Sequence, residues 1–164
     1  TPLKRLSLQA TEVGAVAGAL PPLIGWAAAG SPDWALGAYL FAILFLWQIP
    51  HFMSISWIYR EDYQRGGFAM LAVQDEGGRR VACQGVVYGV LLCLVAPAPL
   101  LWGGASFVFG GLALALSGWF LASALQFFRN PGVTSVARSL FLRSISYLPL
   151  LLLAFVIDRL WFVA

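Results

Sequence analysis

One short segment, residues 47–80, carries most of the residue types that could do chemistry. It holds the only histidine of the chain, four of its seven acidic residues and four of its arginines. The segment passes from an apolar helix directly into a charged loop, which we expect to span residues 59–80. Because polar groups are costly to bury next to hydrocarbon, they seldom lie there by accident. We therefore expect the functional site in this segment.

The charged loop contains two adjacent pairs of acidic residues, each with arginine close by. Its charged residues are Arg60, Glu61, Asp62, Arg65, Asp75, Glu76, Arg79 and Arg80. Carboxylates can hold Mg²⁺ against a substrate phosphate, and arginine binds phosphate oxygens in a fork. A diphosphate-binding site and an ordinary solvated loop both remain consistent with this pattern.

The helix before the loop combines a proline with polar and aromatic side chains. Pro50 lacks a backbone N–H and is expected to kink the helix. Gln48 and His51 are three residues apart, so they lie on one face, beside Trp47 and Phe52. Two interpretations stay open: a structural kink with interhelical hydrogen bonds, or the wall of a polar-lined cavity for a flat apolar ligand.

The composition indicates a membrane protein. Hydrophobic residues make up 60% of the chain and charged residues only 10%, against about 25% charged in ordinary soluble domains. A membrane-spanning helix needs about 20 apolar residues. Five blocks approach that length and are apolar on all sides, so we expect five membrane helices, at residues 11–29, 34–58, 81–102, 105–128 and 140–157.

The basic residues predict the orientation in the membrane. With five crossings, nearly all of them fall on one side, and only Arg159 lies opposite. Short loops rich in Lys and Arg stay in the cytoplasm, so we expect the loop at 59–80 to face the cytoplasm, or the matrix of a mitochondrion. The net charge of +3 is thus a topology signal. It does not indicate a nucleic-acid partner.

Two further features narrow the interpretation. Cys83 and Cys93 are ten residues apart on one expected helix, about 15 Å along its axis, so we expect neither a disulfide nor a metal site but two small buried residues. The first residues show no initiator Met and no signal-peptide pattern. We expect the chain to be the later part of a longer protein.

Several motifs resemble one family of membrane enzymes. In order along the chain, they are LKRLS at 3–7, GALPPLIGW at 18–26, WQIPHF at 47–52, YREDYQRGGFAML at 59–71 and SYLPLLL at 146–152. They are similar to the protoheme IX farnesyltransferases, or heme O synthases, which are intramembrane prenyltransferases related to 4-hydroxybenzoate polyprenyltransferase. The resemblance implies an all-α bundle of nine membrane helices, of which this chain would supply the last five.

The resemblance also implies a reaction and its participants. The family transfers the farnesyl group of farnesyl diphosphate to a vinyl group of heme B, with addition of water, giving heme O and diphosphate. Relatives use Mg²⁺. The resemblance implies Glu61 and Asp62 as catalytic acids and Asp62 as the metal ligand. The substrate-binding residues it implies are Lys4, Arg5, Trp47, Gln48, His51, Arg60, Tyr63 and Arg65. The expected location is the plasma membrane of a bacterium, with the mitochondrial inner membrane as the alternative.

The chain departs from the family pattern at three points. The first aspartate-rich motif is absent from this sequence. In the second motif Tyr59 and Tyr63 take the outer positions of the DxxxD found in the wider superfamily, and Ala10 stands where close relatives often carry Asn. A quinone-pathway prenyltransferase is the nearest alternative enzyme, and WQIPHF argues against it. A transporter or membrane subunit is the non-enzymatic alternative, and the sequence shows no internal repeat that would favour it.

The spacing of the two polar sites predicts their relative depth. If the helix continues from His51 to Asp62, the two residues lie roughly 16 Å apart along its axis. That is about half the hydrocarbon thickness. We therefore expect His51 well inside the bilayer and Asp62 at its surface.

Overall fold

All regular secondary structure in the described part of the chain is helical. The computed structural model describes residues 10–30 and 33–162. The long helices are α2 (Ala10–Ala28), α3 (Trp34–Ile58), α6 (Arg79–Val95), α7 (Phe107–Arg129) and α8 (Thr134–Trp161). Three short ones are α4 (Arg60–Arg65), α5 (Leu71–Gln74) and the 3₁₀ helix η1 (Ala98–Trp102). The predicted all-α fold is confirmed.

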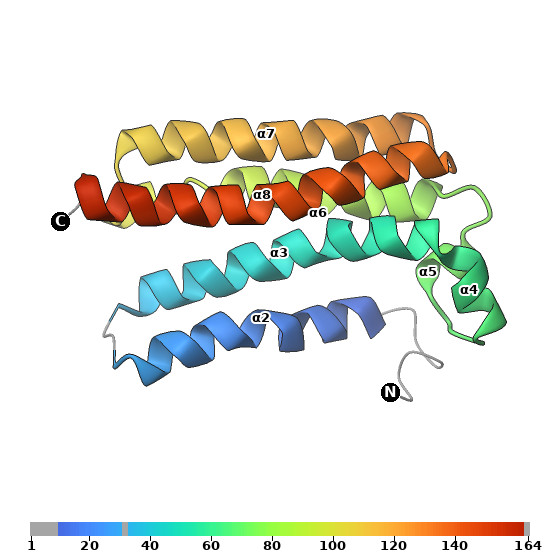
Figure 1. The fold of residues 1–164 in the computed structure, drawn as a ribbon, viewed down its shortest axis with the longest axis horizontal. Coiled ribbons are helices and arrows are strands. Elements are labelled where there is room, and N and C mark those ends of the chain that lie inside the picture. The colour runs from blue at the N-terminus through green and yellow to red at the C-terminus, as the bar shows by residue number, and fades with distance from the viewer. Residues whose placement is uncertain (1–9, 31–32, 163–164) are drawn as a thin grey trace.

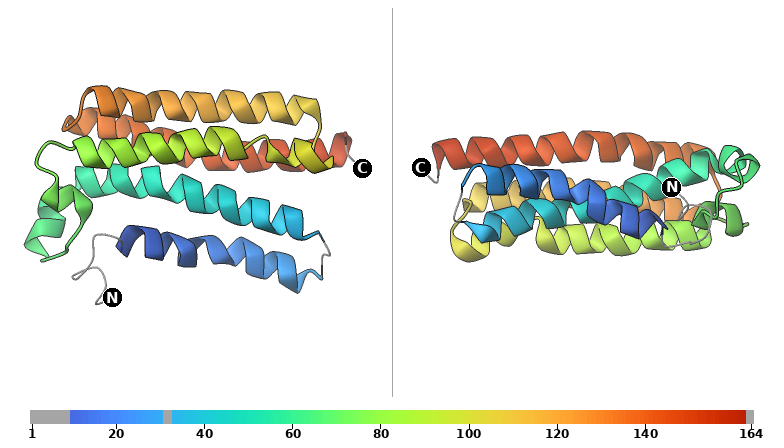
Figure 2. Two further views of the ribbon diagram at one scale, coloured as in Figure 1. Left: turned by 180° about the vertical axis from the view of Figure 1, so that it is seen from behind. Right: turned by 90° about the horizontal axis from the view of Figure 1, so that it is seen from below.

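Four of the long helices form a closed bundle. Helix α3 packs against α6 and α8, and α7 packs against the same two helices from the other side. Helix α2 lies outside this ring against α3 (Figure 1), and the two further views show the same arrangement (Figure 2). The largest fully buried side chains are Trp57, Tyr147, Phe109, Phe120, Phe127, Ile43, Ile49 and Met53. This packing places α3 at the centre, in contact with three other long helices.

The bundle has the lengths and composition of a membrane protein. Within the described residues, four helices are long and apolar enough to cross a bilayer: Trp34–Ile58, Arg79–Trp102, Phe107–Arg129 and Thr134–Trp161. Helix α2 has 19 residues, but it contains Glu12 and two prolines and falls short of that apolar content. Four of the five expected crossings are thus supported by length and composition.

The helix boundaries differ from the predicted ones where proline or arginine intervenes. The predicted helix at 81–102 begins at Arg79, and its α-helical part ends at Val95. The 3₁₀ helix η1 follows because Pro97 and Pro99 lack the N–H that an α-helix needs. Helix α8 begins at Thr134, six residues before the predicted start at 140. Its first turns carry arginine, so hydropathy alone underestimates its length.

The segment predicted as a loop at 59–80 is partly helical, and it does not continue α3. Helix α3 ends at Ile58, and Tyr59 leaves the helical conformation with φ −107° and ψ 24°. Helix α4 then turns aside from the axis of α3 (Figure 1). The predicted bounds of this helix, 34–58, are confirmed, whereas the condition of a helix continuing from His51 to Asp62 is not met, so the depth difference estimated from it does not apply.

The two ends of the bundle differ in character. Helices α4 and α5, the start of α6 and the turn between α7 and α8 all lie at one end (Figure 1). With the adjoining ends of α7 and α8, these elements carry Arg60, Arg65, Arg79, Arg80, Arg129 and Arg138. We call this end of the bundle the charged end. At the opposite end Asp158 accepts hydrogen bonds from the backbone and side chain of Ser106, and Arg159 donates to the carbonyl of Gly104. These bonds join the chain at the start of α7 to the end of α8.

The cysteine prediction holds in part. Cys83 and Cys93 are both free thiols, as expected. Cys83 is exposed on the outer side of α6 and Cys93 is only half-buried, so the expectation that both are buried is wrong for Cys83 and holds only partly for Cys93. A helix on the rim of a bundle shows one face to its surroundings, and Cys83 lies on that face.

The arrangement of the ends generates a topology prediction. We expect the charged end on the cytoplasmic or matrix side, because Lys and Arg are retained there. In a background in which Cys83 and Cys93 are replaced by serine, Gln74→Cys and Ala29→Cys place single thiols at exposed positions of opposite ends. In sealed right-side-out vesicles an impermeant maleimide should label position 29 directly and position 74 only after permeabilisation. The reverse pattern would contradict the orientation.

Candidate active site

The charged end is organised around the buried indole of Trp57. This side chain is almost completely buried, and its Nε1 donates to the carbonyl of Gly132 at 3.3 Å. Gly78, with φ +72°, passes so close that an added Cβ would lie 2.8 Å from the Gly132 nitrogen and 3.0 Å from the indole. Only glycine fits this left-handed, crowded position. The turns before α6 and α8 therefore close over Trp57.

The same indole anchors the charged segment. The guanidinium carbon of Arg60 lies 4.3 Å from the centre of the Trp57 ring, in the geometry of a cation–π contact. This contact fixes the first residue of α4 against the end of α3. The position of Arg60 is thus set by the bundle core.

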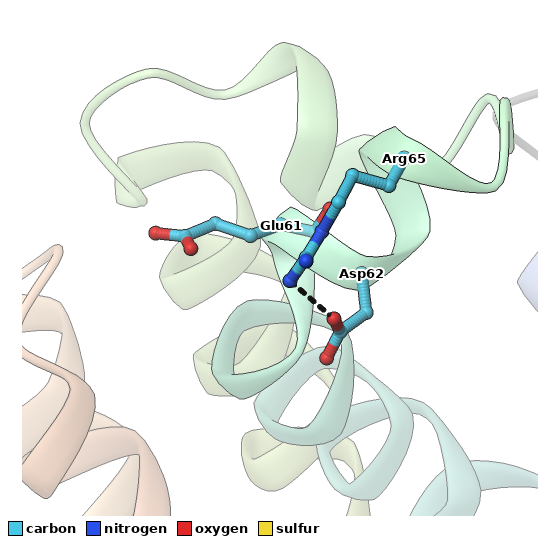
Figure 3. A network of polar contacts seen from close by, with 3 residues as sticks. All are labelled: Glu61, Asp62 and Arg65. Atoms are coloured by element: carbon cyan, nitrogen blue, oxygen red, sulfur yellow. Dashed lines mark hydrogen bonds and ion pairs between the residues drawn. The ribbon is translucent and has the colours of Figure 1, made fainter.

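The two acids predicted to be catalytic point in different directions. Asp62 accepts a hydrogen bond from Nη2 of Arg65 at 2.6 Å, and both side chains are largely exposed. Glu61 extends away from this ion pair (Figure 3). Adjacent residues of a helix are separated by about 100° around its axis, so the two side chains leave α4 in different directions.

A polar cavity lies between α4 and the segment around α5. Its volume is about 390 Å³, and it is lined by Arg60, Glu61, Gln64, Ala72, Val73, Asp75 and Glu76. Two of the predicted residues, Glu61 and Arg60, thus lie on one cavity, whereas Asp62 and Arg65 do not line it. Tyr63 packs edge-on against Phe68, with ring centres 5.9 Å apart, and so supports the turn after α4. Lys4 and Arg5 lie outside the described residues.

Asp75 has a structural role that the sequence analysis did not foresee. Its carboxylate accepts a hydrogen bond from the backbone N–H of Val81 at 2.9 Å, in the first turn of α6. Asp75 is buried, while its neighbour Glu76 is exposed. The acid therefore satisfies a helix terminus that would otherwise lack a partner. This leaves Glu61 and Glu76 as the cavity carboxylates without such a bond.

The residues of the polar cavity could bind Mg²⁺ only together with oxygen atoms of a substrate. Among the described residues, no group of three or more His, Cys, Asp or Glu side chains is placed to hold a metal ion. Mg²⁺ commonly binds to one or two protein carboxylates together with substrate phosphates and water. Glu61 and Glu76 on the polar cavity fit that pattern, with Arg60 as a phosphate contact. The predicted ligand Asp62 is engaged by Arg65 instead.

A second cluster of polar side chains lies inside the bundle, between α3 and α8. Nδ1 of His51 is 2.7 Å from Oγ of Ser144, and Nε1 of Trp47 donates to the carbonyl oxygen of Ser144 at 2.8 Å. The rings of Trp47 and His51 are stacked, with centres 4.8 Å apart. Phe141 of α8 lies 5.3 Å from the imidazole centre. His51 is therefore held by aromatic rings and one serine.

Gln48 is turned toward a different neighbour. It is buried, and an added Cβ at Gly18 would lie 2.3 Å from its Oε1. Gly18 thus allows α2 to approach α3 closely at this point. Gln48 contacts α2, whereas His51 contacts α8. The sequence analysis did not find Ser144, which lies two residues before the SYLPLLL motif and carries no distinguishing pattern of its own.

Comparison with known proteins gives the family. The model of the UbiA prenyltransferase family matches residues 1–145. The chain belongs to this family. It is 48% identical, over its whole length, to a protein named protoheme IX farnesyltransferase from Opitutus terrae, of which it covers 56%. The mitochondrial protoheme IX farnesyltransferase of Homo sapiens is 45% identical over 93% of the chain, which covers 34% of that protein.

The chain covers only part of each of these relatives. A third relative with the same name, from Solibacter usitatus, is 44% identical over 97% of the chain, which covers 54% of it. The chain thus spans about half the length of the bacterial relatives it matches, in their C-terminal part. No solved structure matches the chain significantly.

The role of Asp75 can be tested by stability. We expect Asp75→Ala to destabilise the bundle by about 1–2 kcal/mol, because the N–H of Val81 loses its acceptor. Asp75→Asn keeps an acceptor oxygen and should cost less. Denaturant unfolding in mild detergent gives the comparison, with Glu76→Gln as the exposed neighbouring control. Equal stability of Asp75→Ala and Glu76→Gln would exclude the capping role.

Proposed function

We propose that this chain is the C-terminal part of an enzyme that transfers the farnesyl group of farnesyl diphosphate to a vinyl group of heme B. The observation that carries the proposal is the presence of two different sites, one beyond the C-terminal end of α3 and one within this helix. A polar cavity with Arg60 and Glu61 lies at the charged end. The aromatic group around His51 lies further along the same helix, inside the bundle. The names of its family relatives support the same reaction.

The proposed reaction requires both environments. The bond between the farnesyl carbon and the diphosphate oxygen breaks, and the farnesyl carbon forms a bond to a vinyl carbon of the porphyrin. Water adds to the neighbouring carbon and loses a proton, which gives the hydroxyl of heme O. Diphosphate leaves with both electrons of the broken bond. Its developing charge must be stabilised by cations, and the allylic cation must be shielded from stray water.

The residues of the charged end would hold the diphosphate. Arg60 offers a planar set of donors to phosphate oxygens, and its contact with Trp57 holds it in place beforehand. Glu61 and Glu76 would hold Mg²⁺, which would supply positive charge to the leaving group. Asp62 balances the charge of Arg65 and fixes its orientation. Arg65 is the second candidate for the diphosphate.

The bundle interior would receive the apolar partners. Porphyrin and prenyl chain are large and apolar, and aromatic side chains pack well against such flat surfaces. Trp47 and His51 are the residues we assign to this role, and Gln48 contributes through the α2 contact. A lipid bilayer surrounds the bundle. Bacterial relatives and human mitochondrial relatives both match, and we propose the bacterial plasma membrane, with the mitochondrial inner membrane as the alternative.

The acids of α4 should matter for turnover. In the full-length enzyme we expect Asp62→Asn and Glu61→Gln each to lower turnover by about 10²-fold or more, because Asp62 would no longer orient Arg65 and Glu61 would no longer hold Mg²⁺ at the leaving group. Heme B binding should remain. For Glu61→Gln the loss should depend on the Mg²⁺ concentration, whereas for Asp62→Asn it should not, since Asp62 acts through Arg65. A heme O product assay beside a heme B titration separates chemistry from binding.

A matched control comes from the opposite end of the bundle. Asp33 accepts a hydrogen bond from the N–H of Leu36 at the start of α3. Asp33→Asn makes the same chemical change and keeps an acceptor oxygen, so turnover should stay at the wild-type level. Near-normal turnover of both α4 variants would show that these acids are only loop charges.

His51 should affect the heme substrate selectively. We expect His51→Ala to weaken heme B binding or misplace its vinyl group, and to leave the affinity for farnesyl diphosphate nearly unchanged. Separate titrations with each substrate measure this difference. If the variant binds heme B normally and makes heme O at the normal rate, but accumulates poorly in the membrane, His51 serves only the structure of the helix.

A further inference from the structure

Ser144 of α8 makes three polar contacts that converge beside His51. Its hydroxyl oxygen lies 2.6 Å from the carbonyl oxygen of Phe141 and 2.7 Å from Nδ1 of His51. Its carbonyl oxygen accepts the indole N–H of Trp47 at 2.8 Å. Ser144 is completely buried. One residue of α8 thus contacts two side chains of the WQIPHF motif, Trp47 and His51.

These distances determine which imidazole nitrogen carries the proton. A serine hydroxyl has a single proton to donate. Two oxygens 2.6 Å apart repel each other unless a proton lies between them, so the hydroxyl of Ser144 donates to Phe141. It then presents only lone pairs to His51, and Nδ1 must be the donor. A neutral imidazole carries its proton on one nitrogen, and charging it inside a membrane helix is costly.

We propose that Ser144 is a positioning residue that holds the proton of His51 on Nδ1 and leaves the lone pair of Nε2 free for a tetrapyrrole substrate. In the part of the chain that the structure describes, the hydrogen bond of the imidazole is made by Nδ1, and none is made by Nε2. Nε2 can ligate the iron of the tetrapyrrole or accept a hydrogen bond from it. The identity of the ligand rests on the proposed function, whereas the tautomer does not.

The ring is also prevented from turning over. Trp47 stacks on the imidazole at an interplanar angle of 23°, and Phe141 and Phe52 lie 5.3 Å and 5.6 Å from its centre. The hydrogen bond of Trp47 to Ser144 holds the stacked indole in turn. The orientation of Nε2 is therefore fixed by α8 as well as by α3. A serine that orients a histidine for its ligand acts as outer partners of metal-bound histidines do.

The tautomer can be measured directly. The protein is labelled with imidazole-¹⁵N histidine, purified without a histidine tag, and the signal of His51 is assigned by its loss in His51→Gln. We expect Nδ1 protonated and Nε2 bare in the absence of any ligand. Ser144→Ala should shift the ratio of tautomers by about tenfold, the equivalent of one hydrogen bond. Ser144→Thr keeps the hydroxyl and should keep the wild-type ratio.

Ser123 provides the matched control. It is equally buried, and its hydroxyl makes the same bond to the carbonyl three residues earlier, at 2.6 Å, but it has no contact with His51. Ser123→Ala should leave the tautomer unchanged. A bare Nδ1 in the wild type, or an unchanged ratio in Ser144→Ala, would overturn the role of Ser144 and leave the proposed function intact.

A titration with heme B tests the ligand. Ser144→Ala should bind heme B about tenfold more weakly with an altered absorption spectrum, while Ser144→Thr and Ser123→Ala should match the wild type. If the tautomer shifts in Ser144→Ala and heme B binds as before, Nε2 does not face the tetrapyrrole and that half of the inference is wrong. If the wild type itself binds no heme B, the proposed function fails and the tautomer result still stands.

Discussion

The burial of Trp57 under two glycine turns is the interaction on which the charged end depends. The indole fills the end of the bundle, contacts Phe127 at a ring separation of 6.3 Å and bonds to the backbone of the α7–α8 turn. Gly78 and Gly132 allow the two turns to meet above it. Arg60 then stacks on the outer face of the same ring. A charged segment is thereby attached to an apolar core without burying its charge.

The sequence predicts the helices well and the charged segment poorly, for physical reasons. Membrane helices are recognised by long apolar blocks, and four of the five blocks reappear as helices that could cross a bilayer. The break at Tyr59 carries no comparable signal, since Tyr59 is neither proline nor glycine. Directly after the break Arg60 packs onto Trp57, and Trp57 itself is covered by the distant turns at Gly78 and Gly132.

The polar residues of the candidate site likewise could be predicted only in part from the sequence. Residue type identified Glu61, Asp62 and His51 as candidates, but not their directions. Glu61 faces the polar cavity and Asp62 faces Arg65, although they are neighbours in sequence. Ser144 and Asp75 gain their roles from partners on other elements, His51 on α3 and Val81 in α6. Such pairings belong to the folded bundle, so a reading of one sequence cannot supply them.

The end of α3 at Tyr59 also explains how the proposed reaction could use one helix for two opposed purposes. An ionising diphosphate needs charged groups near water, and an allylic cation needs a dry apolar wall. If α3 continued straight, its charged residues would extend beyond the bundle into solvent. Because the chain turns at Tyr59, α4 lies beside the end of the bundle (Figure 1). The polar cavity between α4 and the segment around α5 therefore lies at that end. In the proposed reaction, the diphosphate would lie at this end of the bundle and the apolar part of the substrate further inside.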